Sequence, residues 1–246
     1  MSSDFQTALP AANLNAALRR LFDVTVALAG MLLFLVFLAP VVLAIHLDSP
    51  GPILFSQVRL GQHGRPFRLY KFRKFHHGRR AQTGTLAVTL KDDDRMTRVG
   101  RILERTKIDE VPQLWNVLRG DMAVVGPRPE TQDFADCFEG PYQAVLDHKP
   151  GIFGPNQLYF RNECTLYPKN ADPHDFYRKV LFPAKARNDL DYFPRRSFGQ
   201  DIGWILRGLL GLIGIGLPHG KPPGQPSAPV RLGRLRNAPD RPSLPE

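Results

Sequence analysis

The chain has 246 residues, a length that suits one sizeable catalytic domain with appendages rather than several domains. Its 33 Lys and Arg residues against 23 Asp and Glu residues give a formal net charge of +10, which favours an anionic partner: nucleic acid, a phosphorylated substrate or an acidic membrane face. Cys137 and Cys164 are too few for a disulfide framework and too far apart for a zinc knuckle, so we expect two reduced thiols in a cytosolic compartment.

A long apolar segment lies near the N-terminus. Residues 24–45 are 22 consecutive residues without a charge, close to the ~20 residues that cross a hydrocarbon core as a helix. They fit a cleaved signal peptide poorly, so we expect the segment in the mature protein. Pro40 should kink or break the helix, because it lacks a backbone donor and clashes with the carbonyl of Val36. Composition weighs a spanning and a re-entrant helix about equally, and basic residues on both flanks, at Arg19 and Arg59, tip the balance towards re-entry.

Turn-forming residues at 48–52 come next and predict a tight exit from the membrane into a strand. Residues 59–80 then contain eight Lys and Arg and no Asp or Glu. This composition suits the lipid headgroup layer, and it would also suit single-stranded nucleic acid. The position directly after an apolar anchor favours the bilayer surface. The apolar and aromatic residues between the charges are Phe67, Leu69, Tyr70, Phe72 and Phe75.

The segment from Thr106 to Gly120 is the most informative part of the chain. Thr106 or Asp109 can cap a helix that ends at Gly120, and with Asp109 as the cap Pro112 lies in the first turn, where its missing N–H costs little. Asp109 and Glu110 would then lie at the positive end of the helix dipole, which favours carboxylates and phosphate oxygens. Capping alone is the common role of such a pair. The apolar face of this helix would consist of Leu114, Val117 and Leu118.

Arg128 follows shortly, between Pro127 and Pro129. Two prolines can hold the guanidinium in a fixed pose for bidentate phosphate recognition, and a solvated surface turn is the alternative. The sequence has no Walker loop, dinucleotide fingerprint, zinc-protease motif or nucleophile elbow, so the common nucleotide and hydrolase scaffolds are unsupported. The carboxylate pair and the arginine together predict a phosphoryl-transfer centre.

Three other segments carry weaker signals. Asp92, Asp93 and Asp94 could bind a metal, but three consecutive acids in a polar connection are more often a solvated loop. Residues 202–213 are apolar but too short to span a membrane, which predicts an interfacial or core helix. Residues 217–246 are rich in proline and basic residues, which predicts a disordered tail that could contact lipid.

Taken together, these residues resemble the bacterial sugar transferase family, the monotopic phosphoglycosyl transferases that begin exopolysaccharide, capsule, O-antigen or glycoprotein glycan assembly. The resemblance runs from about Arg20 to Leu210. Its motifs are Asp48-Ser49-Pro50-Gly51-Pro52, Lys71-Phe72-Arg73, the run from Asp94 to Arg101, Asp109-Glu110, Val125-Gly126-Pro127-Arg128-Pro129 and Lys149-Pro150-Gly151-Ile152.

The resemblance implies a mixed α/β fold, mostly helical with short strands, in a single membrane-associated catalytic domain with interfacial amphipathic helices. The membrane helix would be a helix-break-helix that re-enters the cytoplasmic leaflet of the bacterial inner membrane, with Pro40 at the bend. We therefore expect the compact form of the family, with its catalytic domain on the cytoplasmic face. The expected parts are an N-terminal segment at 1–20, the re-entrant helix at 21–47, the catalytic domain at 48–216 and the tail at 217–246.

The resemblance also implies a two-step reaction. Asp109 would attack the β-phosphate of a UDP-sugar and expel UMP, and polyprenyl (undecaprenyl) phosphate would then take the phosphosugar from the aspartyl enzyme. Asp109 would also contact Mg2+, and Glu110 would assist with metal, proton transfer or positioning. Membrane lipids are expected partners and nucleic acid is not, while a homo-oligomer is left open. The residues that match substrate-binding positions are Lys71, Arg73 and Arg128, with Arg161 and Asp189 aligned less closely.

The sequence departs from the family pattern at two places. Lys74 and Phe75 stand where the family tends to have Ser or Thr and then Met, and Phe153 stands where it favours Thr. These changes bear on the identity of the sugar more than on the class of reaction. Two other functions stay open at this stage: a non-enzymatic lipid- or nucleic-acid-binding module that uses residues 59–80, and a hydrolase that releases sugar phosphate.

Overall fold

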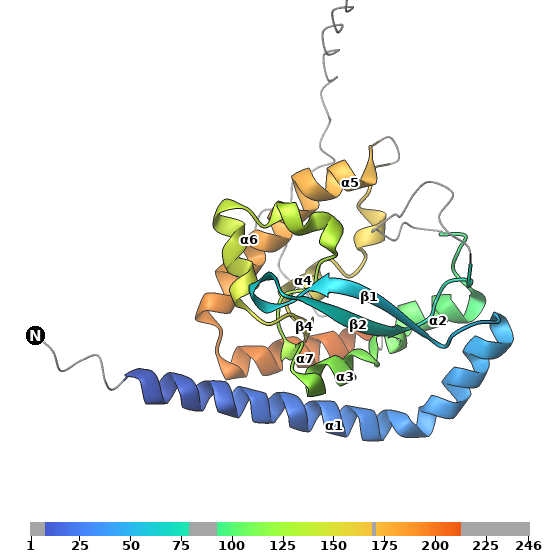
Figure 1. Ribbon diagram of the computed structural model, residues 1–246, viewed down its shortest axis with the longest axis horizontal. Coiled ribbons are helices and arrows are strands. Elements are labelled where there is room, and N and C mark those ends of the chain that lie inside the picture. Colours follow the sequence, from blue (N-terminus) through green and yellow to red (C-terminus); the bar gives the residue numbers. More distant parts are fainter. Residues whose placement is uncertain (1–7, 79–92, 169–170, 213–246) are drawn as a thin grey trace, which may run out of the picture.

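The computed structural model of the protein describes residues 8–78, 93–168 and 171–212, with side chains from residue 14 onward. One long helix, α1 (Ala8–Asp48), runs along one side of a body built from short helices and strands (Figure 1). The expectation of a mostly helical protein with short strands is confirmed. Asp92 and the predicted tail at 217–246 lie outside the described residues.

The elements of the body are short. Its α-helices are α2 (Arg98–Thr106), α3 (Gln113–Arg119), α4 (Pro155–Tyr159), α5 (Pro173–Phe176), α6 (Phe182–Tyr192) and α7 (Phe198–Leu212). Its strands are β1 (Leu54–Leu60), β2 (Pro66–Phe72), β3 (Ala123–Val125) and β4 (Gly151–Phe153). The 3-10 helices are η1 (Gln62–Gly64), η2 (Ile108–Glu110), η3 (Gln132–Cys137), η4 (Gly140–Asp147), η5 (Glu163–Thr165) and η7 (Phe193–Arg195), and a π-helical turn, η6 (Tyr177–Leu181), leads into α6.

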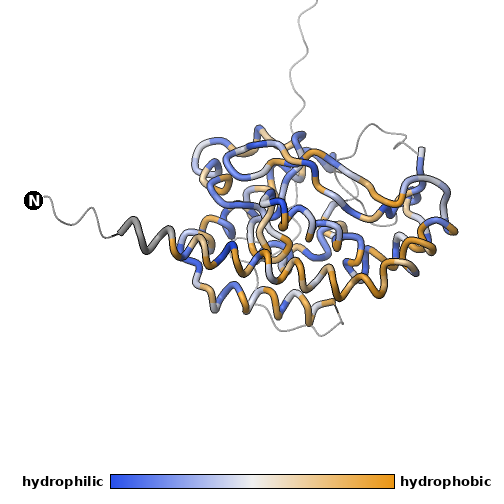
Figure 2. The backbone as a smooth tube through the Cα atoms, turned by 60° about the horizontal axis from the view of Figure 1, so that its bottom comes forward, coloured by the Kyte–Doolittle hydropathy of each residue, from blue (hydrophilic) through white to orange (hydrophobic). Residues whose placement is uncertain are grey.

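The apolar segment forms part of α1, which begins at Ala8, earlier than the predicted start at residue 21. The helix is continuous through Pro40 rather than broken there, and Figure 1 shows that it bends in its C-terminal half, the half that contains this proline. A bend relieves the clash of the proline ring with the preceding turn without ending the helix. Among the described residues, α1 alone has the length and apolar composition of a membrane-crossing helix. Figure 2 shows hydrophobic residues along most of the coloured part of this helix.

Polar side chains fix α1 to the body on both sides of its apolar part. Arg20 donates to two carbonyl oxygens at the end of α3, at 2.6 and 2.7 Å, and the Asp23 carboxylate accepts from the backbone N–H of Val124 at 2.9 Å. At the far end, Asp48 accepts from the backbone N–H of Val99, which lies in the first turn of α2, at 2.8 Å. The same body therefore contacts both ends of the apolar segment.

The turn after α1 leads directly into β1, as predicted, and β1 pairs antiparallel with β2. β2 does not present all its apolar residues to lipid. Leu69 and Phe72 are 2% and 4% exposed, Leu69 in a core with Val117 and Phe72 in a core with Ile45. These two residues of the segment predicted to lie in the headgroup layer are therefore core residues.

The predicted helix at 106–120 is divided in two. Thr106 is the last residue of α2, and Lys107 has a left-handed backbone (φ 58°) that ends the helix there. α3 begins only at Gln113, with Pro112 at its cap position, so neither Thr106 nor Asp109 caps it. Gly120 ends α3 with φ 89°, as predicted, and the predicted apolar face packs into the core that includes α1.

Large apolar side chains remain exposed on several elements besides α1. The predicted apolar helix at 202–213 is α7, which begins at Phe198 and exposes Leu206 and Leu209. On α3, Trp115 is 49% exposed, and on α2, Ile102 is 60% exposed.

Candidate active site

Two buried carboxylates lie in the 3-10 turn η2, between α2 and α3. Asp109 is 2% exposed and Glu110 is 9% exposed. The backbone N–H of Glu110 donates to the carbonyl of Lys107 at 3.1 Å, which closes the turn. A left-handed backbone is uncommon for a residue other than glycine, so Lys107 stores strain next to the carboxylate pair. Such strain is frequent at functional sites.

Glu110 is held by two cations from distant segments. The Lys71 ammonium, from β2, lies 2.9 Å from Glu110 Oε1, and an Arg128 Nη lies 3.4 Å from the same oxygen. Burial opposes the charged form of Glu110, but Lys71 and Arg128 outweigh it and hold the pKa of Glu110 well below its ordinary value. Burial also lowers the pKa of Lys71, while Glu110 and Asp109 oppose that shift. The site thus contains a buried carboxylate that stays ionised because cations surround it.

Asp109 differs from its neighbour. Its Oδ1 is buried and has no hydrogen-bond partner in the part of the chain that the structure describes. Burial raises the pKa of Asp109 above its ordinary value, an effect that Lys71 opposes and the charge of Glu110 reinforces. A carboxylate oxygen without solvent or donors is a better nucleophile than a solvated one. The two neighbouring acids are therefore suited to different tasks.

Arg128 is more exposed to solvent than Lys71 and Glu110. Its side chain is 37% exposed, whereas those of Lys71 and Glu110 are 15% and 10% exposed. Burial disfavours its charge, but Glu110 and the further acids Glu163 and Glu130 raise the pKa of Arg128 above its ordinary value. Its one hydrogen bond among the described residues, to Glu110, is long, so most of its five donors are available to an anion.

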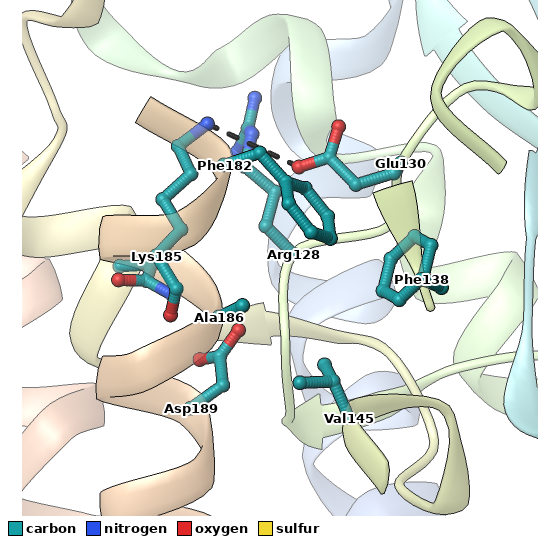
Figure 3. A pocket seen from close by; sticks show the side chains of 9 residues that line it. Arg128, Glu130, Phe138, Val145, Phe182, Lys185, Ala186 and Asp189 are labelled. Atoms are coloured by element: carbon teal, nitrogen blue, oxygen red, sulfur yellow. Dashed lines mark hydrogen bonds and ion pairs between the residues drawn. The ribbon is translucent and has the colours of Figure 1, made fainter. Parts of the chain in front are cut away.

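A buried polar network lies behind Arg128, and the sequence analysis did not predict it. The Lys185 ammonium, 5% exposed, lies 2.6 Å from Glu163, and the Tyr177 hydroxyl donates to Glu130. Figure 3 shows Lys185, Glu130 and Arg128 at one end of a pocket. Glu130 could have been suspected from its place after the Pro-Arg-Pro motif. Lys185 and Glu163 come from separate segments that no local pattern connects.

Asp189 lines the same pocket as Arg128, nearer its other end (Figure 3). It is 5% exposed, and burial raises the pKa of its carboxyl group well above the ordinary value. Arg161 lies apart from the cluster, with an Nη 3.5 Å from the carbonyl of Arg105 and its guanidinium against Gly211 of α7. Of these two less closely aligned residues, the structure brings only Asp189 near Arg128.

The Arg73 side chain binds the turn after α1 rather than the carboxylate pair. It is 6% exposed, and its guanidinium donates to Ser49 Oγ at 2.8 Å, to the Ser49 carbonyl at 2.5 Å and to the Pro52 carbonyl at 2.6 Å. Its position does not support the predicted contact with substrate phosphate. The guanidinium instead holds the turn through which the chain leaves α1.

The carboxylate pair fits a magnesium ion. Mg2+ is usually bound by one or two carboxylates together with substrate phosphates, and Asp109 offers an oxygen without a partner next to a second carboxylate. Asp93 does not offer such a ligand, because it forms an ion pair with Arg95. In the described ranges no three His, Cys, Asp or Glu side chains are grouped as a ready metal site. An ion at Asp109 would therefore depend on ligands from the substrate.

Comparison with known proteins identifies one family and several named relatives. A family model described as bacterial sugar transferase matches residues 14–214. A UDP-glucose:undecaprenyl-phosphate glucose-1-phosphate transferase of Caulobacter vibrioides is 44% identical over 198 residues, which is 79% of this chain and 69% of the relative. A protein of the same name from Escherichia coli K12 is 38% identical, over 78% of this chain and 39% of the relative. A UDP-N-acetylgalactosamine-undecaprenyl-phosphate N-acetylgalactosaminephosphotransferase of Aeromonas hydrophila is 36% identical, over 66% of this chain and 39% of the relative.

Proposed function

Because this chain belongs to the bacterial sugar transferase family, we propose that it transfers a phosphosugar from a UDP-sugar to undecaprenyl phosphate. The products are UMP and undecaprenyl diphosphate sugar. The names of the three relatives above support these substrates, and they differ in the sugar, glucose or N-acetylgalactosamine. The chain is a transferase, and its sugar is the open part of the proposal.

The observation that carries the mechanism is the buried Asp109 oxygen without a hydrogen-bond partner. In the first step this oxygen attacks the β-phosphorus of the UDP-sugar. A bond forms between Asp109 and phosphorus, and the bond from that phosphorus to the oxygen bridging the two phosphates breaks. UMP leaves with the bridging oxygen and its electron pair, and the phosphosugar stays esterified to Asp109.

The cations around Glu110 stabilise the charge that moves in this step. Lys71 and Arg128 share one Glu110 oxygen, so Glu110 holds both of them near Asp109 before substrate arrives. Fixed cations of this kind stabilise developing phosphate charge without reorganisation. A magnesium ion at Asp109 would add charge neutralisation of the phosphate oxygens.

In the second step a phosphate oxygen of undecaprenyl phosphate attacks the phosphorus of the aspartyl intermediate. The bond from phosphorus to Asp109 breaks, and the free carboxylate is restored. This step needs the site at a membrane surface. The carboxylate pair immediately precedes α3, which exposes Trp115, and Trp is enriched at membrane–water interfaces.

The contacts of α1 support a re-entrant rather than a spanning arrangement. Arg20 and Asp23 at one end of the apolar segment, and Asp48 at the other, bond to the same body, which supports placing both ends on one side of the membrane. We place that side in the cytoplasm, where UDP-sugars are made. Residues 8–48 would then form the membrane helix, and residues 49–212 the catalytic body.

The two alternatives are less well supported. A non-enzymatic binding module would have no need of the buried cluster of Asp109, Glu110, Lys71 and Arg128. A hydrolase would pass the phosphosugar to water, and the exposed apolar surface of α1 would have no part in the reaction.

The test is UMP release by the purified protein in lipid nanodiscs, with a panel of UDP-sugars, magnesium and undecaprenyl phosphate. We expect repeated turnover with one or a few sugars, only when the lipid acceptor is present, and no turnover by Asp109→Asn. If every sugar failed with the acceptor and magnesium present, the proposal would be rejected. Equal turnover with and without the acceptor would favour the hydrolase.

A further inference from the structure

The Pro127-Arg128-Pro129 segment is held in place through its carbonyl groups. Proline has no backbone N–H, so two of the three residues in the segment can only accept hydrogen bonds. The Pro127 carbonyl accepts from the backbone N–H of Gly151 at 2.8 Å, and the Pro129 carbonyl accepts from an Arg59 Nη at 3.1 Å. The donors that reach these carbonyls therefore decide where the Arg128 side chain begins.

Gln157 of α4 holds the carbonyl just before this segment. Its Nε2 donates to the Gly126 carbonyl at 3.0 Å and to the Gly151 carbonyl at 3.0 Å. The amide fits here because glycine leaves room for it: a Cβ at Gly154 would lie 2.8 Å from both the Gln157 Oε1 and the Gly126 carbonyl oxygen. One side chain thus ties the loop after β3 to the first residue of β4.

The neighbouring carbonyls set the orientation of this amide. With the amide reversed, Gln157 Oε1 would face two carbonyl oxygens that cannot donate to it. In the observed orientation Oε1 is buried and has no hydrogen-bond partner among the described residues. A buried acceptor without a donor is unfavourable, and an apolar side chain of the same length would avoid it. What the fold gains from a glutamine at this position is therefore the two hydrogen bonds of Nε2.

α4 gives Gln157 a rigid base. The neighbouring Asn156 is 1% exposed, and its side-chain amide donates to the Lys185 carbonyl of α6 at 2.9 Å. At the end of α4, the Tyr159 ring packs against Trp204 of α7 with the ring centroids 5.8 Å apart. Two longer helices therefore fix the element from which Gln157 reaches the loop.

Arg128 depends on its backbone because little else holds its side chain. Its one hydrogen bond among the described residues, to Glu110, is 3.4 Å long, and the side chain is 37% exposed. A misplacement of about 1 Å at a reacting centre can cost about a hundredfold in rate. Movement of the backbone at Gly126, two residues earlier, would displace the guanidinium.

We propose that Gln157 is a positioning residue for Arg128: its amide fixes the Gly126 carbonyl, and with it the pose in which the guanidinium meets a substrate phosphate. This inference rests on the proposed function. Gln157 acts only through Arg128 and contacts no reacting atom. The effect of removing its amide should therefore depend on whether the arginine is present.

The test is a double-mutant cycle on the full chain in lipid nanodiscs. UMP release gives kcat and KM for the active UDP-sugar, with enzyme in excess where turnover is slow, and the melting temperature of each variant is recorded. Gln157→Met keeps the length of the side chain and removes its donors. It is made in wild type and in Arg128→Lys, which keeps the positive charge. The matched control is Gln62→Met, which removes an amide that donates to the Asp147 carbonyl, outside this loop, at 2.8 Å.

We expect Gln157→Met to lower kcat/KM about tenfold or more in wild type, the size of one lost hydrogen bond to a charged group. In Arg128→Lys the same change should cost much less, because no guanidinium is left to align. Gln62→Met should turn over as wild type. Gln157→Asn, whose amide is one methylene closer to the backbone, should lie between Gln157→Met and wild type, and it replaces Gln157→Met in the cycle if that variant does not fold.

Two results would overturn the inference. In the first, the kcat/KM of the Gln157 variant equals that of Gln62→Met. In the second, the fold-loss is the same in wild type and in Arg128→Lys, which would mean that Gln157 supports the fold in general and not Arg128. Failure of the proposed function would look different, because wild-type protein itself would then show no turnover with any sugar.

Discussion

Replacing Arg73 by Met should damage the fold rather than substrate binding. The guanidinium is buried, and three of its hydrogen bonds, to Ser49 and Pro52, are between 2.5 and 2.8 Å long. Each buried acceptor left without its donor costs about 1–3 kcal/mol, so the loss of these three hydrogen bonds should cost about 3–5 kcal/mol or more. At about 2–4 °C per kcal/mol for a chain of this size, the melting temperature should fall by about 6–20 °C.

The assay is thermal unfolding in detergent, followed by the fluorescence of the two tryptophans. The control is Arg68→Met, which removes an arginine from the same strand whose hydrogen bond among the described residues is an exposed one to Ser56. That variant should melt within a degree or two of wild type, since such exposed contacts contribute little. If Arg73→Met kept the wild-type melting temperature but lost affinity for the UDP-sugar, the structural role of Arg73 would be refuted. That result would support the predicted contact of Arg73 with substrate phosphate.

Three further predictions follow from the site. Asp109→Asn should raise the melting temperature at neutral pH, because an acid whose pKa is raised in the folded state lowers stability as the pH rises above the pKa of the unfolded chain. The difference should vanish at acid pH, and equal melting at neutral pH would contradict the prediction. Lys71→Met should shift the acid limb of the pH–activity profile to higher pH, because Lys71 lowers the pKa of the nucleophile, whereas an unmoved limb would exclude the coupling. Gly126→Ala should lower both stability and activity, because the new Cβ would lie 2.1 Å from the carbonyl oxygen of Lys149 and Gly126 is only two residues before Arg128. A variant that melts and turns over as wild type would rule out this close packing.

Local patterns in the sequence predicted those parts of the fold that local forces decide. The apolar run, the turn at 48–52 and the end of α3 at Gly120 follow from composition and from glycine and proline geometry. The start of α3 could not be placed, because the left-handed backbone at Lys107 depends on how α2 packs, not on a glycine signal.

The candidate site divides in the same way. Asp109, Glu110 and Arg128 stand in recognisable motifs, and the structure brings the two acids and the arginine together with Lys71. Arg73 shares a motif with Lys71 but does not bind the carboxylate pair. It lies two residues later in the chain, where its guanidinium donates to the turn after α1. Lys185 and Glu163 come together only through the tertiary fold, so no spacing could have revealed them.

The central claim is that Asp109 carries the phosphosugar, and intact-protein mass spectrometry tests it most directly. Wild-type protein mixed with its UDP-sugar in the absence of undecaprenyl phosphate should gain the mass of one phosphosugar, lose it when the lipid is added, and show no gain as Asp109→Asn. Lipid-linked product that accumulates while no adduct forms, or an adduct that persists in Asp109→Asn, would contradict the account.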